Sequence, residues 1–113
     1  MLVAVVETDS NLSKARKIMS EAEMETVVSM ISASPVAGDV IQGTGGLRKL
    51  RIPLQGRGKR GGGRVVYWYY NGDYPAILLW VFAKNEAADL SPSQKKLLAN
   101  ASEAFTRQFR SVK

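Results

Sequence analysis

The 113-residue chain contains neither cysteine nor histidine. Without cysteine it forms no disulfide and offers no thiolate to a metal ion, which fits a reducing compartment. Without histidine it lacks the usual general base near neutral pH and the usual metal ligand, and every Ser-His or Cys-His nucleophile arrangement is excluded. Any catalysis must therefore use lysine, arginine, tyrosine or carboxylate groups.

Long apolar runs are missing as well. The N-terminal sequence MLVAVVETD has a short apolar run with no basic region before it, which is not the pattern of a secretion signal. The longest later run, Ala76–Ala83, is too short to cross a bilayer. We expect a cytoplasmic protein, and the length and the 45% hydrophobic content favour one domain over residues 1–113.

What the chain does have is a concentrated positive charge. The stretch Leu47–Arg64 holds seven of the sixteen basic residues and none of the ten acidic ones, so the rest of the chain is nearly neutral. The seven are Arg48, Lys49, Arg51, Arg57, Lys59, Arg60 and Arg64. Such a local field favours a polyphosphate partner. The alternative is a solvated hairpin whose charges protect a sheet edge, although one or two charges would suffice for that.

The apolar periodicity predicts the element order β-α-α-β-β-β-α. This is an α+β fold with a small, mostly antiparallel sheet and helices packed on one side. The strands are predicted at residues 2–6, 48–54, 64–70 and 75–83, with a loop at 35–46 and a tight turn at Asn71-Gly72. Helices are predicted to begin after Asp9 or Ser10, at the capping box Ser20–Glu23 and at Ser91, and the second to end at Ser34-Pro35.

Strand alternation separates the basic residues by face. Lys49 and Arg51 fall on one face of the predicted strand, and Arg48 falls on the other with Leu50. Lys84 ends the apolar strand close to the arginines, where like charges and partial burial would disfavour its ammonium form. Lys84 is therefore a candidate proton-transfer group, and a simple strand terminus is the equal alternative.

The glycine-rich and aromatic segments have common alternative interpretations. The glycines of residues 56–61 have the spacing of a dinucleotide-binding motif, but that motif opens a helix and a strand is predicted here. The segment also does not match the kinase-type glycine loop or the P-loop. The aromatic run Tyr67–Tyr70 is more typical of a core strand than of a base-stacking platform, with any one tyrosine remaining a possible stacker.

Two segments together resemble a known family. GDVIQGTGGLRKLRIPLQGRGKRGGGRVVYWYY and ILLWVFAKNEAADLSPSQKKLL are similar to the RelE/ParE superfamily of type II toxins, in its HigB-like branch, over about residues 36–99. The resemblance implies a single RelE-like domain that cleaves mRNA in the ribosomal A site, with no metal and no cofactor. It also implies a HigA-like antitoxin as partner.

The resemblance also assigns residues. Lys49 and Arg51 match the basic pair on the strand after the loop, and Lys84 matches the basic position ending the last strand. Arg64 matches the arginine that opens the next strand, and it is the best candidate for a bidentate clamp on the scissile phosphate. Where well-known members carry an arginine and a catalytic tyrosine, this chain has Asn85 and Ser91.

The general base therefore stays open among Lys59, Lys84 and Glu86. Contacts to RNA or the ribosome are expected from Arg48, Arg57, Arg60, Asn85 and Glu86. Two other functions remain open. One is inhibition of gyrase without catalysis, as in the ParE members, and the other is RNA binding without cleavage.

Overall fold

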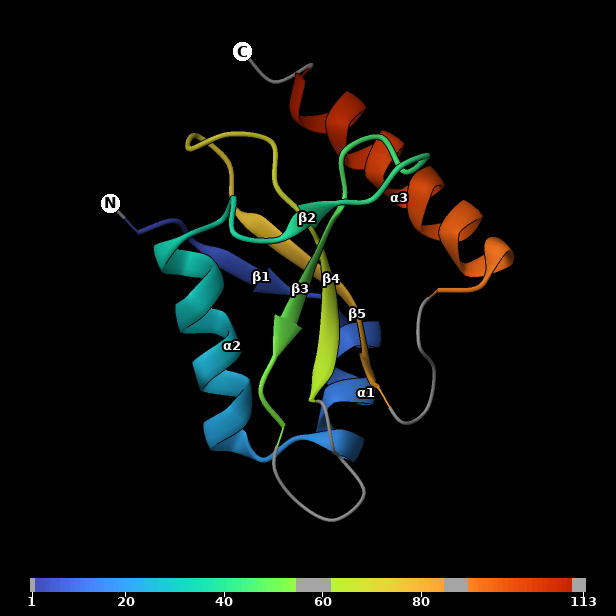
Figure 1. The fold of residues 1–113 in the computed structure, drawn as a ribbon. Coiled ribbons are helices and arrows are strands. Elements are labelled where there is room, and N and C mark those ends of the chain that lie inside the picture. Colours follow the sequence, from blue (N-terminus) through green and yellow to red (C-terminus); the bar gives the residue numbers. More distant parts are fainter. Residues whose placement is uncertain (1, 55–61, 85–89, 111–113) are drawn as a thin grey trace.

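The computed structural model describes residues 2–54, 62–84 and 90–110. These residues form a five-stranded sheet and three helices (Figure 1). The elements in chain order are β1 (Val5–Glu7), α1 (Asp9–Ile18), α2 (Glu21–Ala33), β2 (Asp39–Val40), β3 (Arg48–Ile52), β4 (Gly63–Trp68), β5 (Ala76–Ala83) and α3 (Pro92–Arg110). Within this described part, no helix is both long and apolar enough to cross a membrane.

The strands lie in the order β1-β5-β4-β3-β2. β1 runs parallel to β5, and the other neighbours are antiparallel, so the predicted α+β class and mostly antiparallel sheet are confirmed. The short strand β2 adds one element to the predicted order. It pairs with β3 through only two residues, and a strand that short leaves no periodic pattern in the sequence.

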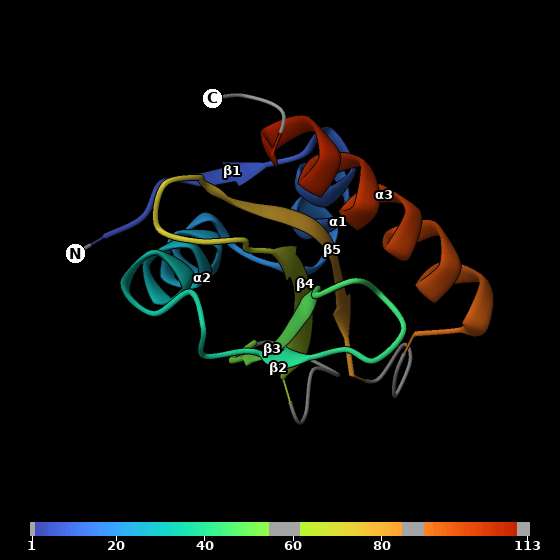
Figure 2. The same cartoon turned by 90° about the horizontal axis from the view of Figure 1, so that it is seen from above.

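The helices cover both faces of the sheet, and the predicted one-sided arrangement is wrong in this respect. α1 and α2 pack against one face, where Val65 and Tyr67 of β4 are buried. α3 packs against the other face, over Val66 and Trp68, and Figure 2 shows α2 and α3 on opposite sides of the strands. Since β4 is apolar on both faces, each face needs a cover.

Side-chain caps fix where the helices begin. The predicted capping box at Ser20 and Glu23 is confirmed, and Ser91 and Gln94 form the same reciprocal pair before α3. The first helix begins one or two residues earlier than predicted, because the cap is Thr8 rather than Asp9 or Ser10. The Thr8 hydroxyl accepts from the Asn11 N–H and donates to the Leu78 carbonyl, so it also ties α1 to β5.

A bulge alters the alternation in the central pair of strands. Val66 lies opposite Trp80 and Tyr67 lies opposite Leu78, which leaves Leu79 without a partner in β4. Leu79 and Trp80 consequently belong to the same apolar cluster, on the α3 face. This extra residue widens the apolar surface of β5 toward α3.

Candidate functional site

Two arginines lie directly opposite each other in the sheet. In the antiparallel register of β3 and β4, Arg51 pairs with Arg64, and Lys49 pairs with Val66 two residues along. Side chains on opposed residues of neighbouring strands share a face. Lys49, Arg51 and Arg64 therefore lie on the α3 face of the sheet, since Val66 packs there.

α3 leaves this end of the face open. It covers the far end of β4, where the Trp68 indole N–H donates to the Thr106 hydroxyl at 3.1 Å and the ring stacks against Phe109. Arg64 lies near the opposite end of the same strand and is only partly buried, while Arg51 is exposed. Arg51 thus faces solvent, and the half-buried Lys49 and Arg64 lie beside the part of the sheet that α3 covers.

Lys84 adds a fourth cation at this end of the sheet. Its backbone N–H donates to the Gly62 carbonyl at 3.0 Å, which holds the end of β5 beside the start of β4. The side chain of Lys84 is exposed, so the predicted partial burial is wrong. We call Lys49, Arg51, Arg64 and Lys84 the cationic face.

Two glycines set the position of Arg64. Gly62 has φ +71°, and a Cβ there would collide with the Ile52 carbonyl of β3. At Gly63 a Cβ would lie 2.7 Å from a Leu54 methyl and 2.8 Å from the Phe82 carbonyl. These two positions require glycine, and they bring the start of β4 tightly between β3 and β5.

Arg51 and Arg64 bring two like charges to directly opposed positions of the cationic face. Like charges directly opposite across an antiparallel pair destabilise a sheet. The Arg64 guanidinium donates one hydrogen bond to the Gly63 carbonyl at 2.9 Å, which orients the side chain and leaves its other N–H groups for further acceptors. An anion lying between Arg51 and Arg64 would relieve the repulsion and accept from both.

Arg48 does not belong to the cationic face. It pairs with Tyr67 on the α1/α2 face, and its guanidinium donates to the carbonyls of Val36 (3.1 Å) and Gly38 (2.8 Å). The Tyr67 hydroxyl donates to the Pro35 carbonyl and accepts from the Gly38 N–H. Burial raises the pKa of Tyr67, although the Gly38 bond and the nearby Arg48 charge oppose this. Arg48 and Tyr67 thus hold the connection between α2 and β2.

The aromatic run packs mainly in the core. Tyr67 and Trp68 are buried on opposite faces, as expected for a strand covered on both sides. Tyr70, which is 44% exposed, stacks on Trp68 with ring centroids 6.0 Å apart. The packing interpretation is therefore confirmed for Trp68.

Five predicted site residues lie outside the described residues. They are Arg57, Lys59, Arg60, Asn85 and Glu86.

A hollow of about 360 Å³ lies next to Arg51, and sequence reasoning missed it. Besides Arg51 it is lined by Ile52, Pro53, Leu54 and Gly62. It depends on the close approach of the Gly62 backbone to Ile52, which no periodic pattern reveals. Its apolar lining residues Ile52 and Leu54 belong to the cluster on the α1/α2 face.

Fold and site together define a class: a small α+β protein with a cationic patch on an open part of its sheet. A family model described as the RelE toxin of the RelE / RelB toxin-antitoxin system matches residues 7–111. The chain belongs to the RelE toxin family, which confirms the predicted superfamily.

A solved structure of E. coli toxin RelE, a double arginine-to-alanine mutant in the free state, is also similar in fold. The two chains share 15% identity at a TM-score of 0.55, over 78% of this chain and 90% of that one.

Proposed function

We propose that this RelE-family toxin is a ribosome-dependent endoribonuclease that cleaves mRNA in the A site without a metal ion. In this proposal it acts in the cytoplasm as a single domain, belongs to the HigB-like branch, and is neutralised by a HigA-like antitoxin. Family membership supports the toxin role. The chemistry rests on the cationic face.

The observation that carries the proposal is the opposition of Arg51 and Arg64. Two guanidinium groups on directly opposed residues repel each other in the free protein, and stability alone gives no reason to retain them. A phosphodiester between them turns the repulsion into two charge-assisted interactions. Lys49 and Lys84 extend the same field along the sheet and past its end.

The cleavage step uses the RNA's own nucleophile. The 2′-hydroxyl attacks the adjacent phosphorus, the bond to the 5′ oxygen breaks, and the products are a 2′,3′-cyclic phosphate and a 5′-hydroxyl. Arg51 and Arg64 stabilise the negative charge that builds on the phosphoryl oxygens in the transition state. Because the groups are already in place, little reorganisation is needed when that charge develops.

Proton transfer must remove the 2′ proton and supply one to the leaving 5′ oxygen. We assign one of these roles to Lys84, and its position directly after β5, beside the start of β4, supports this assignment. Lys59 and Glu86 remain the other candidates from the sequence.

Induced expression with mapping of transcript 5′ ends tests the proposal. We expect growth arrest and new transcript ends that carry a 5′-hydroxyl and lie at defined positions within codons. Both effects should disappear in Arg64→Ala. Arg64 has one hydrogen bond to its neighbour's carbonyl, so the variant should still fold. The matched control is Arg107→Ala, which removes an exposed arginine of α3 and should stay toxic.

Three results would contradict the proposal. An Arg64→Ala protein that is folded and as toxic as the parent would remove the mechanism. DNA damage with unchanged transcript ends would point to gyrase inhibition. The third result is salt-dependent RNA binding without strand scission when the protein is added to purified ribosomes carrying mRNA. It would identify the chain as an RNA-binding module without nuclease activity.

A further inference from the structure

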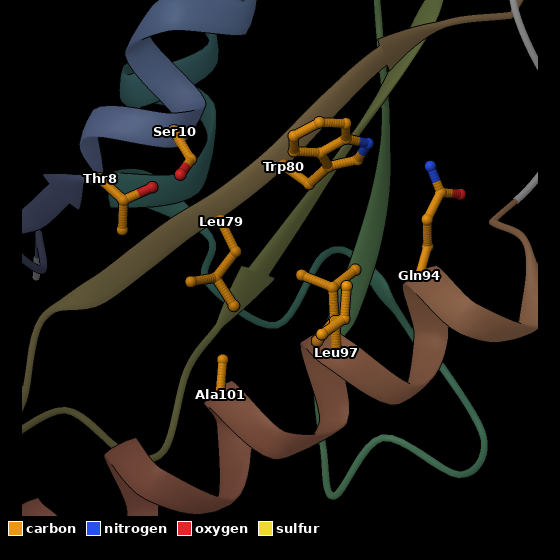
Figure 3. Close-up of a pocket in the computed structure, with 8 residues that line it drawn as sticks. Thr8, Ser10, Leu79, Trp80, Gln94, Leu97 and Ala101 are labelled. Atoms are coloured by element: carbon orange, nitrogen blue, oxygen red, sulfur yellow. The ribbon is translucent and has the colours of Figure 1, made fainter.

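An apolar groove lies over β5, on the same face of the sheet as the cationic face but toward α1. It has a volume of about 350 Å³ and is formed by the start of α1, by β5 and by one flank of α3 (Figure 3). We call it the α1–α3 groove, and its principal lining residues are Thr8, Leu79, Trp80, Leu97, Leu98 and Ala101. Figure 3 shows Ala101 of α3 directed toward Leu79 of β5, with Trp80 farther along the same strand.

The groove is lined mainly by apolar groups, and some of its polar atoms already form hydrogen bonds within the protein. The Thr8 hydroxyl already bonds to Asn11 and Leu78, and the Gln94 side-chain oxygen already accepts from the Ser91 N–H. A small polar ligand would find few convergent partners there. The occupant must therefore present mainly apolar side chains.

The flank of α3 continues beyond the groove as a stripe. Leu97, Ala101 and Ala104 recur at helical spacing along it, and Leu97 is 70% exposed. Such exposure of a large apolar side chain beside an apolar groove marks a contact surface. The small alanines permit close approach of another helix, at an axis separation of roughly 8–10 Å.

Charge indicates which protein fills the groove. The Lys14 ammonium lies 5.8 Å from the centre of the Trp80 ring, at the α1 side, and the two helices that flank the groove, α1 and α3, together hold seven basic and two acidic residues. A second copy of this chain would bring the same positive charge to the interface. A partner helix with an apolar face and acidic flanks complements the groove better.

We infer that the α1–α3 groove binds an amphipathic, acid-flanked helix of the antitoxin. This assignment rests on the proposed function only in taking the antitoxin as the partner of the toxin. Trp80 pairs with Val66 and Val66 pairs with Lys49, so Trp80 and Lys49 are two strands apart, or about 10 Å. Leu97 lies on α3, whereas the four cations lie on β3, on β4 and at the end of β5. Changes in the groove should therefore weaken antitoxin binding and spare toxicity.

Leu97→Asp and Leu2→Asp make a matched pair for the test. Both leucines are exposed to a similar degree, 70% and 73%, but Leu2 lies before β1, away from the groove. The probe is the protein encoded next to this chain, co-expressed with it and also purified. We expect Leu97→Asp to remain toxic, to escape rescue by the neighbour, and to bind it at least about tenfold more weakly. Leu2→Asp should be rescued like the parent.

Thiol protection gives a second, direct measurement. Since the chain has no cysteine, Leu97→Cys carries a unique thiol. It should react with a maleimide in the free protein and be protected in the complex, whereas Leu2→Cys should react in both.

The outcomes separate the two proposals. Equal rescue and equal binding of Leu97→Asp and Leu2→Asp, or an unprotected thiol in the complex, would overturn the docking site. Protection that rises with the concentration of the isolated protein would assign the groove to a second copy and also overturn it. Absence of toxicity in the parent would contradict the proposed function, while thiol protection by the neighbour would still report on the groove.

Discussion

Arg51 and Arg64 occupy opposed positions on neighbouring antiparallel strands, at the cost of mutual repulsion. Arg51 is exposed, so solvent screens part of this repulsion. The neutral variant Arg51→Gln should raise the free energy of unfolding in low salt, by up to about 0.5 kcal/mol. Urea unfolding measures this, and the difference from the parent should shrink in high salt, because a salt dependence identifies an electrostatic cause.

The matched control for Arg51→Gln is Arg107→Gln. Arg107 lies 3.3 Å from Glu103 in an exposed i,i+4 pair, so its removal should leave stability unchanged or slightly lower. If both variants changed stability in the same direction and by the same amount, the repulsion between the opposed arginines would not be the cause.

Tyr67 makes stability depend on alkaline pH. Burial raises its pKa, so the folded state keeps the phenol protonated at a pH where the unfolded chain has begun to ionise. The stabilisation is complete below about pH 10, the ordinary value for tyrosine, and is lost as the pH rises through the folded-state pKa. Above pH 10 the unfolding free energy of the parent should therefore fall.

Tyr67→Phe tests this assignment. The variant orphans the Gly38 N–H and the Pro35 carbonyl, so it should be less stable at pH 8 by about 1–3 kcal/mol. Its unfolding free energy should fall less steeply than that of the parent between pH 9 and 11, values chosen around the ordinary tyrosine pKa of about 10. Urea titrations at several pH values measure both effects, and parallel pH curves would show that another group is responsible.

At the scale of elements, the start of β4 depends on one glycine. Gly62 combines φ +71° with contact to the Ile52 carbonyl, so Gly62→Ala introduces backbone strain and a collision. We expect a loss of about 1–3 kcal/mol in the free energy of unfolding. The loss of toxicity should follow, because the same residue holds Arg64 and Lys84 together through its carbonyl.

Gly72→Ala is the control for this change. Gly72 has no positive φ, and a Cβ there meets open space, so alanine should be neutral or slightly stabilising by restricting the unfolded chain. Thermal unfolding of the two variants separates a position that requires glycine from one that merely tolerates it. Equal losses would mean that the strain at Gly62 is overestimated.

The elements show how far sequence reasoning reaches. Capping residues have a local chemistry, so Ser20 with Glu23 and Ser91 with Gln94 could be predicted. Strand alternation likewise placed Lys49 and Arg51 on one face. The pairing of Arg51 with Arg64 could not be predicted, since register depends on the connection between β3 and β4. The bulge at Leu79 was equally hidden, because one unpaired residue leaves no period of its own.

At the scale of the whole molecule, α3 divides one sheet face into two functional surfaces. It covers Trp68 and leaves the cationic face exposed at the other end of β4. Its outer flank forms a wall of the α1–α3 groove. One helix thus separates the proposed catalytic surface from the proposed docking surface, while both share the rigid strands β4 and β5. A catalytic variant and a binding variant can therefore be made independently.

This division predicts how RNA binding responds to salt. If the four cations of the cationic face each neutralise one phosphate, the logarithm of the binding constant for single-stranded RNA should fall with the logarithm of salt concentration, with a slope of about −3. Arg64→Ala should make the slope shallower by somewhat less than one. Leu97→Asp lies outside the cationic face, and its added negative charge should lower affinity slightly without changing the number of phosphates contacted. Fluorescence titrations of a labelled RNA across a salt series measure all three slopes. If the parent and Arg64→Ala had the same slope, Arg64 would not contact a phosphate. Its position opposite Arg51 would then no longer support the proposed mechanism.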